Sequence, residues 1–181
     1  MLFRSIFLNE TIKTLLERRS IRSFKSEQVK NDDLDLILKA GTYAPTARGT
    51  QAPVMVVVQD AETIAEMEKL NAEVMGNPEA RPFYGAPTVI VVFSDTRLTN
   101  NAFQDGSLVL GNLMNAAFSL GVDSCWINRA TETFKTPAGI ELMKKWGLDE
   151  NYIGIGNCIL GYRDCELPEA KPRKDGYIIR T

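Results

Sequence analysis

Residues 18–22 read RRSIR and place three arginines and a serine within five positions of a chain whose net charge is −2. A second basic group, KPRK at 171–174, lies near the other end of the chain beside a proline. Guanidinium groups suit phosphate oxygens, so the two groups could bind one anionic ligand together. Two ordinary alternatives stay open. Arginines that follow a helix can complement its dipole, and KPRK can be a solvated tail.

The absence of histidine removes several kinds of active site. Ser-His-Asp and Cys-His catalysis, His-ligated zinc and the iron site with two histidines and a carboxylate all need that side chain. The three cysteines, Cys125, Cys158 and Cys165, include no Cys-x-x-Cys pair, so neither a metal site nor a disulfide framework is expected. An enzyme of this composition would depend on a bound organic cofactor for its reactive group.

Composition also limits the expected partners and compartment. The chain has 21 Lys and Arg against 23 Asp and Glu, so nucleic acid is not expected as a partner. No stretch approaches the roughly 18 uninterrupted apolar residues of a membrane helix, so no membrane is expected. Arg4 interrupts the N-terminal run MLFRSIFLNE, which is too short for a signal peptide. The unpaired cysteines favour a reducing cytoplasm.

Hydrophobic periodicity predicts the elements that must position these groups. Helices are expected at 9–18 with Asn9 as N-cap, at 31–40 with Gly41 as its end, and near 61–74, 103–120 and 137–146. Short β-branched runs between turn residues predict strands at 53–59, 88–93, 122–127 and 152–160. No linker or repeat divides the chain, so a single domain is expected. Pattern alone suggests an α/β layered fold.

The predicted helix at 103–120 is apolar nearly all round, so it must be buried on more than one side. It could lie in the middle of one domain or form half of a dimer interface, and the second arrangement is favoured because most other helices have one apolar face. One side of this helix carries Phe103, Leu110, Leu113, Met114, Ala117 and Leu120, and beyond it lie Leu108, Val109 and Ala116.

Six motifs follow one another in the order found in FMN-dependent nitroreductases, and the sequence resembles that family over nearly its whole length. The resemblance implies an α+β fold, nitroreductase-like, with a central mixed, mostly antiparallel sheet flanked by helices, in an interlocked homodimer with FMN at each interface. The FMN-binding domain would be residues 1–181, with an N-terminal extension at about 1–8 and a tail at about 162–181 on the partner subunit. The motifs are RRSIRSF, APTARGTQAP (44–53), GAPTVIVVF (85–93), LGVDSCWINRA (120–130), IGNCILGYRD (155–164) and KPRK.

The resemblance gives the basic groups a role as the FMN site. The RRSxR segment binds FMN in this family, and the late basic pair completes its phosphate site. Arg22 matches the position whose cation lies near the pyrimidine edge of the flavin, where it would stabilise the reduced form. The positions matched to the phosphate site are Arg18 and Ser20, with Arg19 between them, together with Lys171 and Arg173.

The CWINRA segment matches the family's contact with the reactive edge of the flavin. Asn128 matches the position whose backbone N–H donates to flavin N5, the atom that exchanges hydride. Asn71 is matched to an asparagine that contacts the pyrimidine ring. Cys125 is expected to be buried rather than nucleophilic, because it has no histidine partner. The residues around Asn128 are Trp126, which could equally be a core aromatic, Ile127 and Arg129.

The APTARGTQAP loop would reach the flavin of the other subunit, although it could also be a simple connection between a helix and a strand. It departs from the common PSxxNxQPW form, because Gly49 stands where Asn is usual, and Ala52 and Pro53 stand where Pro and Trp are usual. The positions that the resemblance assigns to FMN binding are Pro45, Thr46, Ala47, Gly49 and Gln51.

The implied activity is hydride transfer from NAD(P)H through flavin N5 to a nitroaromatic, a quinone or a similar planar acceptor, in ping-pong order. Such chemistry needs no acid or base from the protein, which agrees with the missing histidine; the Asn128 backbone and Arg22 would give electrostatic support. Two alternatives stay open: a protein that stores or senses FMN without useful turnover, and one whose basic groups bind another phosphate ligand. GIGNCILG at 154–161 lacks the spacing of a dinucleotide-binding motif.

Overall fold

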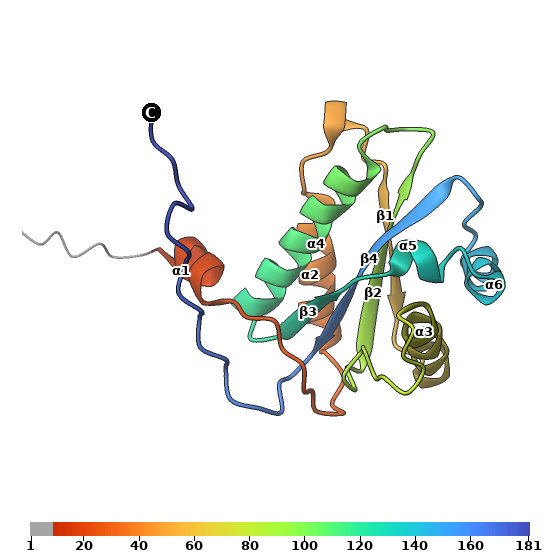
Figure 1. The fold of residues 1–181 in the computed structure, drawn as a ribbon, viewed down its shortest axis with the longest axis horizontal. Coiled ribbons are helices and arrows are strands. Elements are labelled where there is room, and N and C mark those ends of the chain that lie inside the picture. Colours follow the sequence, from red (N-terminus) through yellow and green to blue (C-terminus); the bar gives the residue numbers. More distant parts are fainter. Residues whose placement is uncertain (1–8) are drawn as a thin grey trace, which may run out of the picture.

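The computed structural model describes residues 9–181, in which one four-stranded sheet lies between two groups of helices (Figure 1). The expected extension at 1–8 lies outside the described residues. The sheet order is β1-β2-β4-β3, and every neighbouring pair is antiparallel. A parallel contact is made by an isolated bridge between Ser20 and Ser124. The strands are β1 Pro53–Val58, β2 Thr88–Asp95, β3 Asp123–Ile127 and β4 Tyr152–Gly161.

The antiparallel sheet agrees with the α+β fold that the resemblance implied, and not with the α/β arrangement that pattern alone suggested. The reason lies in β2, whose eight residues are all buried. Val89, Val91 and Phe93 pack on one face of the sheet, and Ile90 and Val92 pack on the other. A strand covered on both faces reads as a continuous apolar run, as parallel strands do. Its direction of pairing therefore cannot be read from the pattern.

Helices cover both faces of the sheet (Figure 1). α2 (Asn31–Thr42) and α4 (Ala102–Ser119) pack on one face, and α3 (Ala61–Val74), α5 (Ala130–Thr133) and α6 (Pro137–Lys145) pack on the other. α1 (Glu10–Glu17) begins after the predicted cap Asn9, whose Oδ1 accepts from the Ile12 N–H at 2.9 Å. Pattern did not predict α5 or the 3₁₀ turn η1 (Ala47–Gly49), because elements this short show no periodicity. None of the helices between residues 9 and 181 combines the length and apolarity needed to cross a membrane.

Gly41 does not end helix α2, so that part of the sequence prediction is wrong. The residue is buried, and the helix continues to Thr42. A Cβ at position 41 would lie 2.9 Å from the side chain of Leu113 and 2.9 Å from that of Met55. The glycine therefore lets α2 approach α4 and β1 closely. This contact joins distant parts of the chain, so the local sequence does not reveal it, and the glycine is read as an ordinary helix end.

Within one chain, helix α4 buries only part of the apolar surface predicted for it, including Leu110, Leu113 and Ala117. Phe103 and Leu120, expected on its buried side, are 48% and 36% exposed, and Leu108 is 47% exposed. Asp105 and Gly106 are buried instead, and a Cβ on Gly106 would meet Ile155 of β4 at 2.6 Å. One side of α4 is thus covered by its own chain, while large apolar side chains of another side are exposed. The apolar residues that the helix does bury are Ala102, Val109, Leu110, Leu113 and Ala117.

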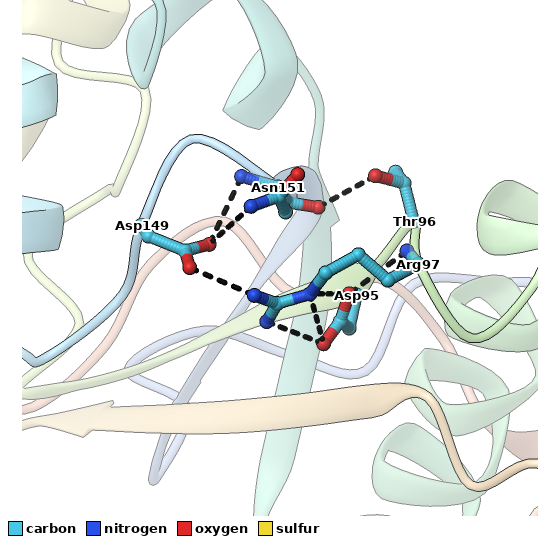
Figure 2. Close-up of polar contacts among 5 residues, drawn as sticks. All are labelled: Asp95, Thr96, Arg97, Asp149 and Asn151. Carbon is cyan, nitrogen blue, oxygen red and sulfur yellow. Dashed lines mark hydrogen bonds and ion pairs between the residues drawn. The ribbon is translucent and has the colours of Figure 1, made fainter.

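A charged cluster ties the turn after β2 to the start of β4 (Figure 2). Arg97 donates to both carboxylate oxygens of Asp95 at 2.7–3.1 Å and to Asp149 at 2.9 Å. The Thr96 hydroxyl donates to the carbonyl of Asn151 at 2.8 Å. The Asp95 side chain is only 8% exposed, and hydrogen bonding from Arg97 lowers its pKa. These contacts hold the ends of two neighbouring strands together.

Candidate functional site

The RRSIR segment leaves α1 as an extended chain and lies against β3. The Ile21 N–H donates to the Ser124 carbonyl at 3.1 Å, and the Ile21 side chain is fully buried. Burial raises the pKa of the Cys125 thiol on this strand, and the positive charges of Arg22 and Arg18 oppose the rise. The bridge between Ser20 and Ser124 and the hydrogen bond of Ile21 therefore place the predicted segment beside β3.

Arg18 and Arg19 use their guanidinium groups differently. Arg19 Nη1 donates to the carbonyls of Leu16 and Arg18, both at 2.8 Å, so it satisfies the C-terminal end of α1. That is the ordinary alternative that composition left open. Arg18 Nη1 is buried and has no hydrogen-bond partner within residues 9–181. Arg19 Nε is likewise buried without a partner in the described chain. Because a buried, unpaired charged donor is unfavourable by roughly 1–3 kcal/mol or more, these two nitrogens fit an anionic ligand.

A pocket of about 270 Å³ lies at the end of β3 and collects five of the predicted site residues. Arg22, Trp126, Ile127, Asn128 and Arg129 line it. The segment between α3 and β2 forms the other wall, which sequence reasoning missed. The signal that could have revealed it is an arginine within NPEARPF, a polar segment without periodicity. The residues of this wall are Met75, Ala80, Arg81, Pro82 and Tyr84.

Asn71 lies next to this pocket but is not part of its lining. The side chain is fully buried, its Nδ2 donates to the Asn128 carbonyl at 2.8 Å, and its Oδ1 accepts from Arg129 Nε at 3.1 Å. Arg129 has φ 74°, a left-handed conformation that is unfavourable by roughly 1–2 kcal/mol for a residue with a Cβ. Asn71 therefore holds the turn after β3 in place. Its direct contact with a flavin stays a prediction.

Trp126 is both a core aromatic and a wall of the pocket. Its indole ring packs over Gly156 of β4, where a Cβ would lie 2.8 Å from Nε1 and 2.9 Å from Cε2. The Nε1 atom is buried without a hydrogen-bond partner among the described residues. Cys125, the preceding residue, packs on the other face of the sheet and is 1% exposed, as the sequence predicted.

Asn128 is exposed and lies immediately after the last residue of β3. Its carbonyl is held by Asn71, and the loop and cap hydrogen bonds within residues 9–181 include none from its N–H. The bond to its carbonyl holds Asn128 in place, and its N–H can therefore donate to a ligand in the pocket.

The loop with Pro45, Thr46, Ala47, Gly49 and Gln51 lies away from this pocket. The Ala47 N–H donates at 2.9 Å to Asp105 in the first turn of α4, so the loop sits at the N-terminal end of that helix (Figure 1). Its residues line two other hollows, and neither contains a residue of the pocket at β3. A single chain therefore does not bring the loop to the residues around Asn128.

The tail is likewise not joined to the other half of the predicted phosphate site. Lys171 and Arg173 are exposed in a segment without helix or strand, which follows a bridge between Phe24 and Arg163. Figure 1 shows this segment extending away from the sheet. Within residues 9–181 neither side chain forms an ion pair with a carboxylate, and the structure shows no contact that joins them to Arg18.

The sequence and the fold were compared with known proteins. The profile of the Nitroreductase family matches residues 15–162. An Archaeoglobus fulgidus protein with a provisional assignment as NADH dehydrogenase/NAD(P)H nitroreductase is 31% identical over 159 residues, which are 86% of this chain and 86% of that protein. The NADPH-flavin oxidoreductase of Vibrio harveyi is 26% identical over 95% of this chain and 73% of its own length. A nitroreductase of Bacteroides fragilis with bound FMN is 29% identical and superimposes with a TM-score of 0.88, covering 96% of this chain and 100% of its own.

Proposed function

Because the chain belongs to the nitroreductase family, we propose that it is an FMN-dependent oxidoreductase with NAD(P)H as its reductant. The observation that carries the proposal is the buried Nη1 of Arg18, a charged donor without a partner in the described chain. It belongs to the same short segment as Arg22, which lines the pocket at β3. The names of the relatives and the FMN bound to the Bacteroides fragilis protein support the choice of cofactor.

The residues present fit a phosphorylated flavin. Arg18 and Ser20 would bind the phosphate, and a late basic pair, Lys171 and Arg173, would complete its site once the tail is placed against it. Arg22 would lie at the pyrimidine edge, and the Asn128 N–H would donate to N5. When bound, FMN would supply the redox chemistry, taking a hydride from NAD(P)H and reducing a nitroaromatic, a quinone or a similar planar acceptor.

The protein's own contribution to this reaction is binding and electrostatics. Arg22 would place a positive charge where the reduced cofactor carries negative charge, which favours reduction. Trp126 would give the pocket a flat, partly apolar wall suited to aromatic acceptors. Neither role requires proton transfer by a side chain, in keeping with a chain that has no histidine.

The proposal includes a homodimer. Gly49 and Gln51 belong to a loop that lies away from the pocket at β3, so they can join an FMN site only if a second copy supplies them. Phe103 and Leu108 on α4 leave apolar surface that a second copy would cover. The cytoplasm is the proposed location, since Cys125, Cys158 and Cys165 are all free thiols.

Steady-state kinetics test the activity. NADH and a quinone acceptor are varied together, and the proposal predicts parallel double-reciprocal lines, because the two substrates would use the same place in turn. Converging lines would contradict that order. Bound FMN with no turnover of any quinone or nitroaromatic would favour the alternative of flavin storage or sensing. The departures from the common family form at Gly49, Ala52 and Pro53 are the reason for keeping that alternative.

A further inference from the structure

Two buried side chains on helix α3 each hold one arginine of the pocket by its Nε atom. Glu68 is 5% exposed, and its Oε2 lies 2.6 Å from Arg81 Nε while its Oε1 accepts from the Phe83 N–H at 2.8 Å. Asn71 accepts from Arg129 Nε at 3.1 Å. Residues three apart lie on one face of a helix, so α3 fixes both arginines from the same side.

The terminal nitrogens of both guanidinium groups are left for a ligand. Within residues 9–181, the hydrogen bonds of the Arg81 and Arg129 side chains involve Nε alone. Both arginines line the pocket with Arg22, and the described lining contains no Asp or Glu. The Arg81 side chain is 77% exposed, so its outer edge faces solvent at the mouth. A guanidinium held through Nε presents its Nη groups as a planar fork, the geometry that binds a carboxylate or phosphate.

We infer that Arg81 and Arg129 form an anion-recognition pair that selects electron-transfer substrates carrying a carboxylate or phosphate group. The inference rests on the proposed function, because it assumes that the pocket at β3 is the redox site. Trp126 and Tyr84 line the same pocket, so the substrate class is an aromatic molecule with an anionic substituent. Such an anion can come from the acceptor, as an aromatic carboxylate, or from the reductant, as the 2′-phosphate that NADPH carries and NADH lacks.

Glu68 acts in this pair as a positioning residue. It uses one oxygen to orient Arg81 and the other to fix the backbone of the following turn at Phe83. Without that carboxylate, Arg81 would keep its charge but lose its fixed direction. Arg81→Lys would also keep the positive charge without a fixed direction. An ammonium group has one nitrogen, so Glu68 cannot hold it at one nitrogen while two others bind the ligand.

The first test compares 4-nitrobenzoate with its neutral analogue 4-nitrobenzamide. The FMN-loaded protein is expected to have the higher kcat/KM for the acid. Arg81→Gln should lower the acid-to-amide ratio of kcat/KM about tenfold, mainly through KM, as expected for loss of one charge-assisted contact. The ratio for Arg81→Lys should lie between those of the unmodified protein and Arg81→Gln. Lys135→Gln serves as the matched control, because it removes an exposed positive charge that does not line this pocket.

The second arm compares NADPH with NADH in the same proteins. If the anion is a nucleotide phosphate, Arg81→Gln will change the NADPH-to-NADH ratio of KM values and leave the acid-to-amide ratio alone. A change in either ratio supports the anion pair and identifies the source of the anion. If both ratios match those of the unmodified protein, the inference is overturned.

Glu68→Gln separates positioning from a purely structural role. A positioning role predicts a selective rise in KM for the anionic substrate, with bound FMN and the kcat for the amide retained. Equal losses for both acceptors, with a lower melting temperature, would show that Glu68 only stabilises the fold and would overturn its assigned role.

A binding measurement keeps this inference distinct from the proposed function. Titration of the oxidised, flavin-containing protein with 4-nitrobenzoate, followed by flavin absorbance, should give a dissociation constant that rises about tenfold in Arg81→Gln. A protein that holds no FMN would contradict the proposed function. Calorimetric titration of the flavin-free chain with 4-nitrobenzoate and with NADPH would then decide the anion pair by itself. Equal affinities of the unmodified protein and Arg81→Gln for both ligands would be the contrary result.

Discussion

At the residue scale, the two neighbouring arginines of RRSIR form different hydrogen bonds because their surroundings differ. Arg19 turns back to carbonyls at the end of α1, whereas Arg18 leaves a buried nitrogen without a partner within the described chain. The two have the same charge and adjacent positions, so composition cannot tell them apart. Arg19 Nη1 binds the helix end, while Arg18 Nη1 and Arg19 Nε are both buried without a partner among the described residues, which is the ground for proposing an anionic ligand beside them.

Arg18→Ala should therefore weaken FMN binding more than a nearby charge removal does. Loss of a charge-assisted hydrogen bond of about 1.5–3 kcal/mol corresponds to roughly a tenfold to hundredfold rise in the dissociation constant. Lys25→Ala is the control, because Lys25 is an exposed positive charge that lies three residues after Arg22. Equilibrium dialysis of FMN measures both variants. Equal affinity in the two would remove Arg18 from the phosphate site.

Thiol reactivity gives a second residue-scale prediction. Burial raises the pKa of Cys158 to about 12 and also raises the pKa of Cys125, while Cys165 is exposed. Because the thiolate is the reactive form, iodoacetamide at neutral pH should modify Cys165 alone in the folded protein and all three cysteines after unfolding. Mass spectrometry of peptides gives the sites. Rapid modification of Cys125 in the folded protein would contradict its place in the core.

At the scale of elements, the ends of β2 and β4 depend on one ion-pair cluster around Arg97. Because hydrogen bonding from Arg97 lowers the pKa of Asp95, the stabilisation is present above the ordinary carboxyl pKa of about 3.9 and is lost as pH falls through the lower, folded value. The cluster also reaches Asp149, so it joins two separate turns.

Arg97→Gln should accordingly flatten the acid side of the stability profile. The unmodified protein is expected to lose this stabilisation as pH falls below about 4, and the variant should lose less over the same range, since its Asp95 has a more ordinary pKa. Urea denaturation at each pH measures this difference. Parallel profiles for the two proteins would show that other carboxylates control the acid response.

The sequence predicted elements better than it predicted how they pack. Periodicity placed the longer helices within a few residues, and β-branched runs between turn residues placed the four strands equally well. The pattern misread Gly41 and did not reveal that Asp105 and Gly106 of α4 are buried, since these features depend on contacts between distant parts of the chain. It also had no means to find the link between Glu68 and Arg81, which forms when a segment without a pattern folds back on α3.

The candidate site was predicted through the resemblance, and one chain assembles only part of it. Arg22 and residues 126–129 line one pocket, because RRSIR lies beside β3 and residues 126–129 form the end of that strand and the turn after it. The loop at 44–53 and the basic pair at 171–174 remain separate from that pocket. The sequence of one chain does not tell whether two segments meet within that chain or only across an interface between two copies.

At the scale of the whole molecule, exposed apolar side chains mark the surface that the proposed dimer would bury. They lie on the first helix, on α4 and in the tail, in elements that also border the incomplete site. Monomeric proteins rarely leave large contiguous apolar patches open. The exposed residues on these elements include Ile12, Leu15, Leu16, Phe103, Leu108, Ile178 and Ile179.

Light scattering after size exclusion should give the FMN-loaded protein twice the chain mass of 20.2 kDa. Leu108→Glu should shift it toward the monomer and reduce its FMN content, because a charge would replace an apolar contact on α4. Ile140→Glu is the control, since Ile140 is similarly exposed on α6, over the opposite face of the sheet. A monomer that retains stoichiometric FMN would contradict the shared site.

The most direct test of the central claim is the visible absorbance of the purified protein, reconstituted with FMN, during anaerobic addition of NADH or NADPH. The account predicts stoichiometric bound flavin whose colour bleaches with at least one of the two nucleotides and returns when a quinone or nitroaromatic is added. Failure to retain flavin, or bound flavin that neither nucleotide bleaches, would contradict the assignment of this chain as an NAD(P)H-dependent flavin oxidoreductase.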